Sequence, residues 1–325
     1  MKKLLFLWFV FTGTITWGQQ ISSLKILSSR YYDDLPSASG VEIYKGNVYL
    51  VADDLPRMFE LDMRGQILHQ YQISGNTKIV NGRTPKNIKA DFESMAIVKQ
   101  NNHDYLLVLS SGSKKIKRDT AYLFSLENKR VVAKKNIRGW YNAIKKKAAM
   151  AVADEINIEG LAIARGKIYV AHRGNVSGNF IASSSLTDFI SYLSGESNVV
   201  PAVDIFPFKL PLYNGLTAGL SGLCSTSDDS GLLVTASLES TDDVVNDGSV
   251  LGSYLGYIPF KTMEKGVIFL TPVVGDNHKM IAKKQEGITL VNVTKKGRYR
   301  VLTVCDNDDG TSDMWQFSFV LSEGK

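Results

Sequence analysis

Cysteine and histidine are scarce in this sequence of 325 residues, which contains two cysteines and four histidines. So few cysteines exclude a disulfide framework, although an oxidising compartment would permit one bridge between Cys224 and Cys305. Both lie in apolar stretches that are expected to form strands, which favours buried thiols. No paired set of histidines and cysteines is present, which argues against a structural zinc site.

Long apolar runs and a catalytic serine motif are also missing. Beyond the N-terminus, no run approaches the roughly 18 apolar residues of a membrane-spanning helix, so no transmembrane segment is expected. No Gly-x-Ser-x-Gly motif occurs, and the serines at 183–185 are typical of a helix start. The sequence therefore does not support a serine-hydrolase triad.

The N-terminus has the composition of a secretory signal peptide. Residues 1–19 begin with a methionine and two lysines, continue with an apolar run at 4–10 and end with small residues. We expect cleavage just before Gln19 or Gln20, and no cysteine lies there to carry a lipid anchor. Residues 20–325 are then predicted to form a single domain that is periplasmic or secreted.

The composition is that of a globular protein, because 44% of the residues are hydrophobic and 22% are charged. The formal net charge is +6, but the lysine runs at 114–117, 145–147 and 295–296 are short and scattered. They lack the interleaved aromatic residues on which nucleic-acid bases stack. We therefore expect these lysines in solvated loops and expect no nucleic-acid partner.

A short motif recurs five times along the chain, about 60 residues apart. Each copy is a Glu or Ser, a small residue and then an apolar stretch, and the copies begin at Ser39, Glu93, Glu159, Ser221 and Glu286. Repeats at a long fixed period indicate a repeat architecture. This period is too long for one turn of a solenoid but fits a four-stranded propeller blade with generous loops.

The sequence therefore predicts an all-β fold, a five-bladed β-propeller. The fifth repeat supplies only three strands, so we expect residues 21–28 to pair with 314–321 and close the ring. In the third unit, residues 174–185 are predicted as a long loop, followed by a short inserted helix that begins at 185–188. Six blades remain an alternative if this region hides a further sheet.

Loop lengths predict which face of the ring binds ligands. The turns at 45–46, 64–65 and 165–166 are tight, whereas the connections on the other face are long. The recurrent Glu or Ser begins each innermost strand on that long-loop face. Because binding residues usually lie on loops held by a rigid scaffold, we expect the functional site there.

Three glutamates are predicted to converge at the channel mouth on this face: Glu93, Glu159 and Glu286. Asp306, at the end of a second strand, should lie beside them. Carboxylates at close quarters raise one another's pKa, and a bound cation relieves this repulsion. Oxygen ligands favour Ca²⁺ or Mg²⁺. Alternatively, each glutamate accepts backbone hydrogen bonds from the next blade and only links the ring.

Two further groups are candidates at the same mouth. His172 is a possible general base and Arg173 a possible anchor for a phosphate or carboxylate, with an ordinary surface pair as the alternative. The run 306–310, Asp-Asn-Asp-Asp-Gly, lacks the twelfth-position glutamate of an EF-hand, so it is either a turn or a ligand loop.

The Glu-Gly-Leu-Ala and Glu-Gly-Ile-Thr segments at 159–162 and 286–289 resemble the repeat of secreted phytase-like propellers (esterase-like phytases) and of the SdiA-regulated-type propellers. This resemblance implies a propeller, export, and a central channel in which glutamates bind a cation. Glu93, Glu159 and Glu286 occupy the matching positions, whereas Ser39 and Ser221 depart from the pattern. Phosphoesterase activity is implied by analogy only.

Two functional hypotheses follow. In the first, the protein is a monomeric, metal-dependent hydrolase of phosphoesters or lactones, with Ca²⁺ at the mouth and His172 and Arg173 in catalysis. In the second, it is a non-catalytic envelope module whose loops recognise a glycan, a peptide or a partner protein.

Overall fold

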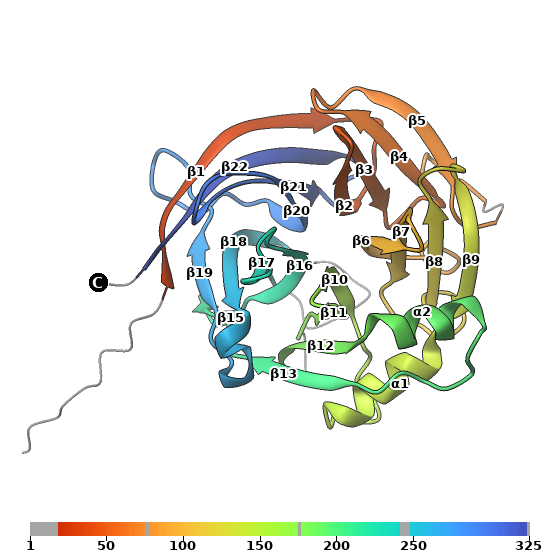
Figure 1. The fold of residues 1–325 in the computed structure, drawn as a ribbon. Helices are drawn as coiled ribbons and strands as arrows, with labels where there is room; N and C mark the ends of the chain where they lie inside the picture. The colour runs from red at the N-terminus through yellow and green to blue at the C-terminus, as the bar shows by residue number, and fades with distance from the viewer. Residues whose placement is uncertain (1–18, 76–77, 175–176, 241–247, 324–325) are drawn as a thin grey trace, which may run out of the picture.

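Five four-stranded antiparallel sheets surround a central axis as the blades of a β-propeller (Figure 1). The structure, a computed structural model, describes residues 19–323 except 76–77, 175–176 and 241–247. The predicted signal sequence lies almost entirely outside the described residues. The prediction of a five-bladed all-β propeller is confirmed.

Each blade runs from an inner strand at the axis to an outer strand at the rim. Blade 1 contains β2 (Ala38–Tyr44), β3 (Asn47–Ala52), β4 (Arg57–Asp62) and β5 (Ile67–Gln72). Blade 2 contains β6 (Phe92–Gln100), β7 (His103–Ser110), β8 (Thr120–Ser125) and β9 (Arg130–Asn136). Blade 3 contains β10 (Ile158–Ala164), β11 (Lys167–His172), β12 (Asn179–Ser185) and β13 (Asp204–Phe208). Blade 4 contains β16 (Gly219–Ser225), β17 (Gly231–Glu239), β18 (Val250–Pro259) and β19 (Phe269–Pro272).

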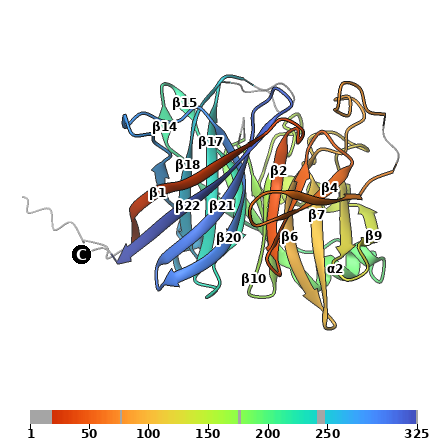
Figure 2. The ribbon, with the colours of Figure 1, turned by 90° about the horizontal axis from the view of Figure 1, so that it is seen from above.

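The fifth blade is built from both ends of the chain. It contains β20 (Lys284–Lys295), β21 (Arg298–Asp306), β22 (Ser312–Glu323) and, at the outside, β1 (Gln19–Tyr32). Figure 2 shows β1 lying along β22, and the register pairs Ile26 with Phe317 and Tyr31 with Asp313. The predicted closure is confirmed. It covers the edge of β22 that would otherwise have no partner strand.

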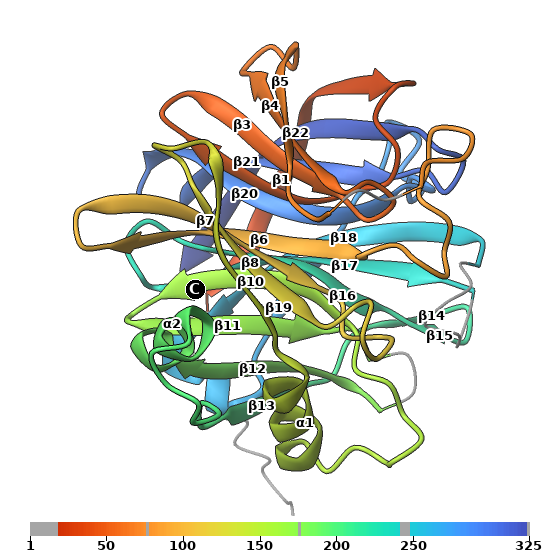
Figure 3. The ribbon, with the colours of Figure 1, turned by 90° about the vertical axis from the view of Figure 1, so that its right-hand side faces the viewer.

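Two α-helices lie outside the ring, near blades 2 and 3 (Figure 3). The predicted insertion is α2 (Leu186–Ser194), and the Ser185 side chain accepts a hydrogen bond from the Asp188 N–H at its N-terminus. The second helix, α1 (Arg138–Lys147), was not predicted; it buries Trp140, Tyr141 and Ile144 on one side. A 3₁₀ helix, η1 (Phe260–Lys265), and a small hairpin of β14 (Leu212–Tyr213) and β15 (Leu216–Thr217) complete the fold.

The prediction that residues 174–185 form a loop is wrong in its second half. Residues 179–185 are β12, which pairs with β11 and β13 and so completes blade 3 rather than starting a sixth blade. Its serines suggested a helix start, but Ser183 and Ser184 are buried within the blade. Small polar residues fit in this strand because larger side chains of neighbouring elements pack against it. Ser184 Oγ, for example, accepts a hydrogen bond of 2.9 Å from Nε1 of Trp140 in α1.

Apolar side chains fill the space between each pair of neighbouring blades. Blades 2 and 3, for example, share a cluster that includes Leu107, Ile158, Val170 and the α1 residue Trp140. Equivalent clusters join the other pairs, including blades 1 and 5. Burial of this surface holds the ring together. Cys224 and Cys305 are free and buried, as expected.

None of the helices within the described ranges is long and apolar enough to cross a membrane.

Candidate functional site

The recurrent Glu or Ser of the motif sits in a β-bulge at the start of every inner strand. In blade 1, Ala38 pairs with Ala52 and Gly40 with Val51, so Ser39 between them has no cross-strand partner. A register shift at the same place leaves out the other four recurrent residues, Glu93, Glu159, Ser221 and Glu286, and in blade 5 it also leaves out the next residue, Gly287. A bulge redirects a side chain away from its normal place on the sheet. The repeat is therefore a structural device that presents one side chain per blade at the channel mouth.

The glycine after the bulge is explained by the packing of neighbouring inner strands. A Cβ atom on Gly222 would lie 1.9 Å from the carbonyl oxygen of Glu286 in the next blade. A Cβ atom on Gly287 would likewise lie 2.3 Å from the carbonyl oxygen of Ser39. The backbones approach too closely for any side chain at these positions. The glycine of the motif is therefore needed for the close packing of neighbouring inner strands.

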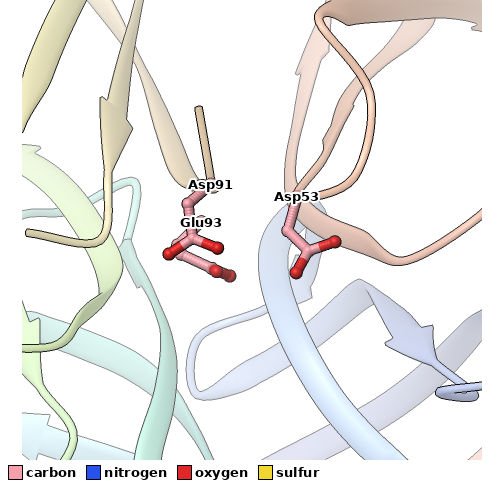
Figure 4. Close-up of side chains that lie close together, drawn as sticks. All are labelled: Asp53, Asp91 and Glu93. Carbon is pink, nitrogen blue, oxygen red and sulfur yellow. The ribbon is translucent and has the colours of Figure 1, made fainter. Parts of the chain in front are cut away.

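Three carboxylates meet where blades 1 and 2 face each other (Figure 4). Asp53 follows β3, while Asp91 and Glu93 stand at the start of β6. One oxygen atom from each lies within 4.8 Å of the others, so the three could hold a metal ion together. We call Asp53, Asp91 and Glu93 the acidic trio.

Lys89 is the principal counter-ion of the acidic trio. Its Nζ lies 3.0 Å from Asp91 Oδ1 and 3.1 Å from Asp54 Oδ1, and it also pairs with Asp53. Arg118 adds a contact of 2.9 Å to Asp91 Oδ2. Glu93, in contrast, forms no ion pair or hydrogen bond with any side chain in the part of the chain that the structure describes.

Neighbouring charges shift the pKa values of these three carboxyl groups in different directions. Burial raises the pKa of Glu93 well above its usual value, and the negative charges of Asp91 and Asp53 raise it further. Burial also raises the pKa of Asp53, more than Lys89 lowers it. For Asp91, burial acts in the same direction, but Lys89 and Arg118 bring its pKa below the usual value. Part of the trio therefore resists full ionisation, which a bound cation would relieve.

On the other side of the mouth, blades 3, 4 and 5 carry a chain of alternating charges. Its members are, in order, Glu159, Arg173, Glu239, Lys284 and Glu286, and we call it the ion-pair chain. The contacts along it are 3.1, 2.9, 3.1 and 2.9 Å. All five residues are buried. Each cation bridges two carboxylates, so the charges on this side largely compensate one another.

The ion-pair chain shifts pKa values in both directions. Burial raises the pKa of Glu239, yet Arg173 and Lys284 together lower it to about 2. Burial outweighs the same two cations at Glu159, whose pKa is raised, and burial raises the pKa of Glu286 strongly despite Lys284. Glu239 is thus the fixed anion at the centre of the chain, while the terminal glutamates hold protons more readily.

His172 lies beneath this side of the mouth and is 1% exposed. Its Nδ1 accepts a hydrogen bond from the Asn157 N–H at 3.0 Å, Nε2 lies 3.0 Å from Ser177 Oγ, and its ring stacks on Phe180 with centroids 4.5 Å apart. Burial lowers the imidazole pKa to about 3. The side chain is therefore neutral at physiological pH and firmly packed; its predicted catalytic role stays a prediction.

Asp306 is buried at the end of β21, where its Oδ1 accepts a hydrogen bond of 2.8 Å from the Asp308 N–H. The 306–310 run is thus a turn. The negative charge of Asp306 also raises the pKa values of Glu286 and Asp53, which places it electrostatically within the mouth. Its function as a metal ligand stays a prediction.

A model of a family of unknown function, DUF6929, matches residues 34–319, which span all five blades. The chain belongs to the DUF6929 family. No curated protein matches the sequence.

The DUF6929 chain is also similar to solved propeller structures. One is the glutaminyl cyclase of Myxococcus xanthus, at 11% identity over 92% of this chain and 97% of that chain, with a TM-score of 0.46. Another is an exo-1,5-α-L-arabinanase from a bovine ruminal metagenomic library, at 9% identity over 89% and 97%, with a TM-score of 0.45. A third is the Cellvibrio cellulosa α-L-arabinanase, at 10% identity over 87% and 91%, with a TM-score of 0.43. Similarity at this level carries no argument about chemistry.

The structure distributes the predicted metal ligands of this DUF6929 protein over both sides of the mouth. Glu93 is part of the acidic trio, whereas Glu159 and Glu286 end the ion-pair chain. The sequence analysis did not identify Asp91 and Lys284 as residues of the mouth. A signal for them exists, since each lies two residues before a recurrent glutamate.

A pocket of about 500 Å³ opens beside the ion-pair chain, between blades 3 and 4. Arg173 and Glu239 contribute charge to its wall, and Phe208 and Leu216 contribute apolar surface. The β14–β15 hairpin forms part of this wall. A mixed wall of this kind suits a ligand that combines polar and apolar groups.

Proposed function

We propose that the acidic trio of this propeller binds a divalent cation, with Ca²⁺ as the preferred candidate. We also propose that the mouth is the active site of a metal-dependent hydrolase that acts on phosphoesters or lactones. The observation that carries the proposal is the convergence of Asp53, Asp91 and Glu93 within 4.8 Å. We further propose that the protein is exported, to the periplasm or beyond, as the N-terminal sequence and the resemblance to phytase-like propellers suggest. We also propose that it acts as a monomer.

The residues present fit a hard cation. All three ligands are carboxylates, which Ca²⁺ and Mg²⁺ prefer. Asp53 Oδ1 is buried without a hydrogen-bond partner among the described residues, and the Glu93 carboxylate is unpaired. Lys89 occupies part of the same space, so binding requires its ammonium group to move away from Asp53 or Asp91.

The chemistry would be divided between the two sides of the mouth. A bound cation would polarise the scissile group and lower the pKa of an attacking water. Arg173 lines the adjacent pocket and would hold the anionic part of a substrate there. Proton transfer would fall to His172 or to a carboxylate that does not bind the cation.

Calorimetric titration of the purified, metal-free protein with Ca²⁺ tests the binding step. We expect saturable binding that is lost in Glu93→Gln and Asp53→Asn. Asp204→Asn is the matched control, because the Asp204 side chain is 59% exposed on β13. Panels of phosphoesters and lactones in added Ca²⁺ then test catalysis, and turnover that persists in Glu93→Gln would overturn the hydrolase proposal.

The second candidate function is a non-catalytic module that recognises a glycan, a peptide or a partner protein. The pocket of about 500 Å³ favours it, because the charges of Arg173 and Glu239 beside it are already compensated within the protein. This hypothesis predicts no turnover in the panels. It also predicts that a Leu216→Asp change, at the pocket wall, abolishes ligand capture while Ca²⁺ binding is retained.

A further inference from the structure

A second polar pocket lies between blades 1 and 2 at the opposite end of their strands from the acidic trio. Its volume is about 480 Å³, and its wall is formed by tight turns: β2–β3 with Lys45, β6–β7 with His103, and β8–β9 with Lys129. Because the trio stands at the start of β6 and these turns join the other strand ends, the pocket belongs to the short-loop face. The proposed hydrolase does not use it.

A buried carboxylate forms the floor of this pocket. Glu60 is 4% exposed, and it accepts hydrogen bonds from Tyr49 Oη at 2.6 Å, Tyr71 Oη at 2.5 Å and Asn47 Nδ2 at 2.6 Å. Burial alone would raise its pKa, but these donors lower it to about 2. Glu60 is therefore a permanent anion in a rigid setting.

The two tyrosine rings and Glu60 together surround one cation, the side chain of Lys129. Its Nζ donates a hydrogen bond of 2.6 Å to Tyr49 Oη, and it lies 3.3 Å from Glu60 Oε2, 4.9 Å from the centroid of the Tyr49 ring and 5.5 Å from that of Tyr71. Aromatic faces and a carboxylate are the partners that recognise organic ammonium ions. We call Tyr49, Tyr71 and Glu60 the tyrosine cage.

The occupant reaches the cage from another blade and remains partly exposed. Lys129 belongs to the β8–β9 turn of blade 2, whereas the cage residues belong to blade 1. Its side chain is 37% exposed, in contrast to 6% for Glu60. A lysine at a surface turn can rotate into solvent and leave a charged, preformed cage behind.

The rest of the pocket wall adds negative charge and a further aromatic face. Tyr44 Oη donates a hydrogen bond of 2.8 Å to Asp104, and Glu127 stands at the rim. Lys45, which lies over the Tyr44 ring at 5.0 Å, is the opposing charge at the rim and is exposed. An aliphatic amine that enters the pocket would therefore meet carboxylates along its path.

We propose that the tyrosine cage is a binding site for an aliphatic ammonium ligand, and that Lys129 is an internal competitor that the ligand displaces. While Lys129 occupies the cage, the ligand cannot bind. The apparent affinity for the ligand is therefore the intrinsic affinity multiplied by the fraction of molecules in which the cage is open. Removal of the Lys129 ammonium group should therefore tighten binding.

Calorimetric titration with n-butylammonium chloride tests the proposal on the full chain. We expect saturable binding that is about tenfold or more tighter in Lys129→Ala than in the unmodified protein. Lys129→Met, which keeps the apolar stem, should behave in the same way and serves if the alanine variant does not fold. Adding Glu60→Gln to either variant should abolish the gain.

Lys167→Ala is the matched control, because it removes the same charge from a partly exposed lysine on blade 3 that does not line this pocket. Its affinity for n-butylammonium should equal that of the unmodified protein. If Lys129→Ala and Lys129→Met lose stability and n-butylammonium binds neither, Lys129 is only a strut between blades 1 and 2 and the proposal is overturned. An equal gain in Lys167→Ala would also overturn it. Neither result bears on Ca²⁺ binding at the acidic trio.

Discussion

The two sides of the channel mouth use the same motif to opposite electrostatic effect. On the side of blades 1 and 2, Glu93 faces Asp53 and Asp91 and forms no ion pair with any of the described residues. On the side of blades 3 to 5, Glu159 and Glu286 each pair with a buried cation, Arg173 or Lys284. The bulge presents all three glutamates in the same way, so their different surroundings decide their chemistry.

The residue two positions before the glutamate accounts for much of this difference. It is Asp91 before Glu93, and Lys284 before Glu286. An aspartate at this position adds negative charge to the mouth, whereas a lysine compensates it. The same repeat can therefore contribute to a cation site in one blade and to an ion pair in another.

Removing a central cation from the ion-pair chain should have the largest effect. Arg173→Met leaves Glu159 buried without its ion pair and Glu239 paired with Lys284 alone, which costs about 3–5 kcal/mol of unfolding free energy. Urea denaturation measures this loss. The matched control is Lys167→Met, whose partner Asp204 is exposed and which should cost no more than about 1 kcal/mol. Equal losses in the two variants would contradict the assignment of the ion-pair chain.

Calcium should distinguish the two sides. At about 100 times its dissociation constant, Ca²⁺ should stabilise the unmodified protein by about 2.7 kcal/mol. Lys89→Met, which removes the internal cation of the trio, should lose stability in chelator and regain it in Ca²⁺. Arg173→Met keeps the acidic trio, so Ca²⁺ should stabilise it only as much as it stabilises the unmodified protein and should not restore the lost stability. Thermal melts of both variants with Ca²⁺ and with chelator measure this difference. If Ca²⁺ restores the stability of both variants, or of neither, the two sides of the mouth do not differ in cation binding.

Acid should weaken the side of blade 3 through His172. The folded-state pKa of about 3 lies below the ordinary value of 6.5, so the unfolded chain binds more protons between these values. Stability should therefore fall as the pH drops below 6.5, by about 2 kcal/mol near pH 5. Urea denaturation of His172→Gln should not show this loss of stability in acid. His103→Gln, which changes an exposed histidine, should still show it. A pH profile unchanged in His172→Gln would contradict the burial argument.

The side of blades 1 and 2 should respond to pH with the opposite sign. The pKa of Glu93 is raised in the folded state, so the folded chain binds more protons above the ordinary glutamate pKa. Its contribution to stability is present at low pH and is lost as the pH rises through the folded-state value. In metal-free buffer, Glu93→Gln should be more stable relative to the unmodified protein at pH 8 than at pH 5. A constant difference would show that Glu93 has an ordinary environment.

The order of the blades was readable in the chain because bulges and close strand contacts restrict residue types locally. The Glu or Ser followed by a small residue repeats in each inner strand, and the apolar residues 21–28 with no place in a blade indicated the closing strand. The β12 strand and α1 were not recognised. Serines in β12 and the lysine-rich end of α1 hide the apolar contacts that only neighbouring blades provide.

The sequence by itself determined the ring, its closure through both termini, and the presence of carboxylates at the mouth, since these depend on patterns within single strands. Only the tertiary structure decided which charges meet. Asp53 and Glu93 come from different blades, as do Arg173 and Glu239, and electrostatic energy depends on distance in space rather than along the chain. The acidic trio, the ion-pair chain and the tyrosine cage all lie at such contacts between blades.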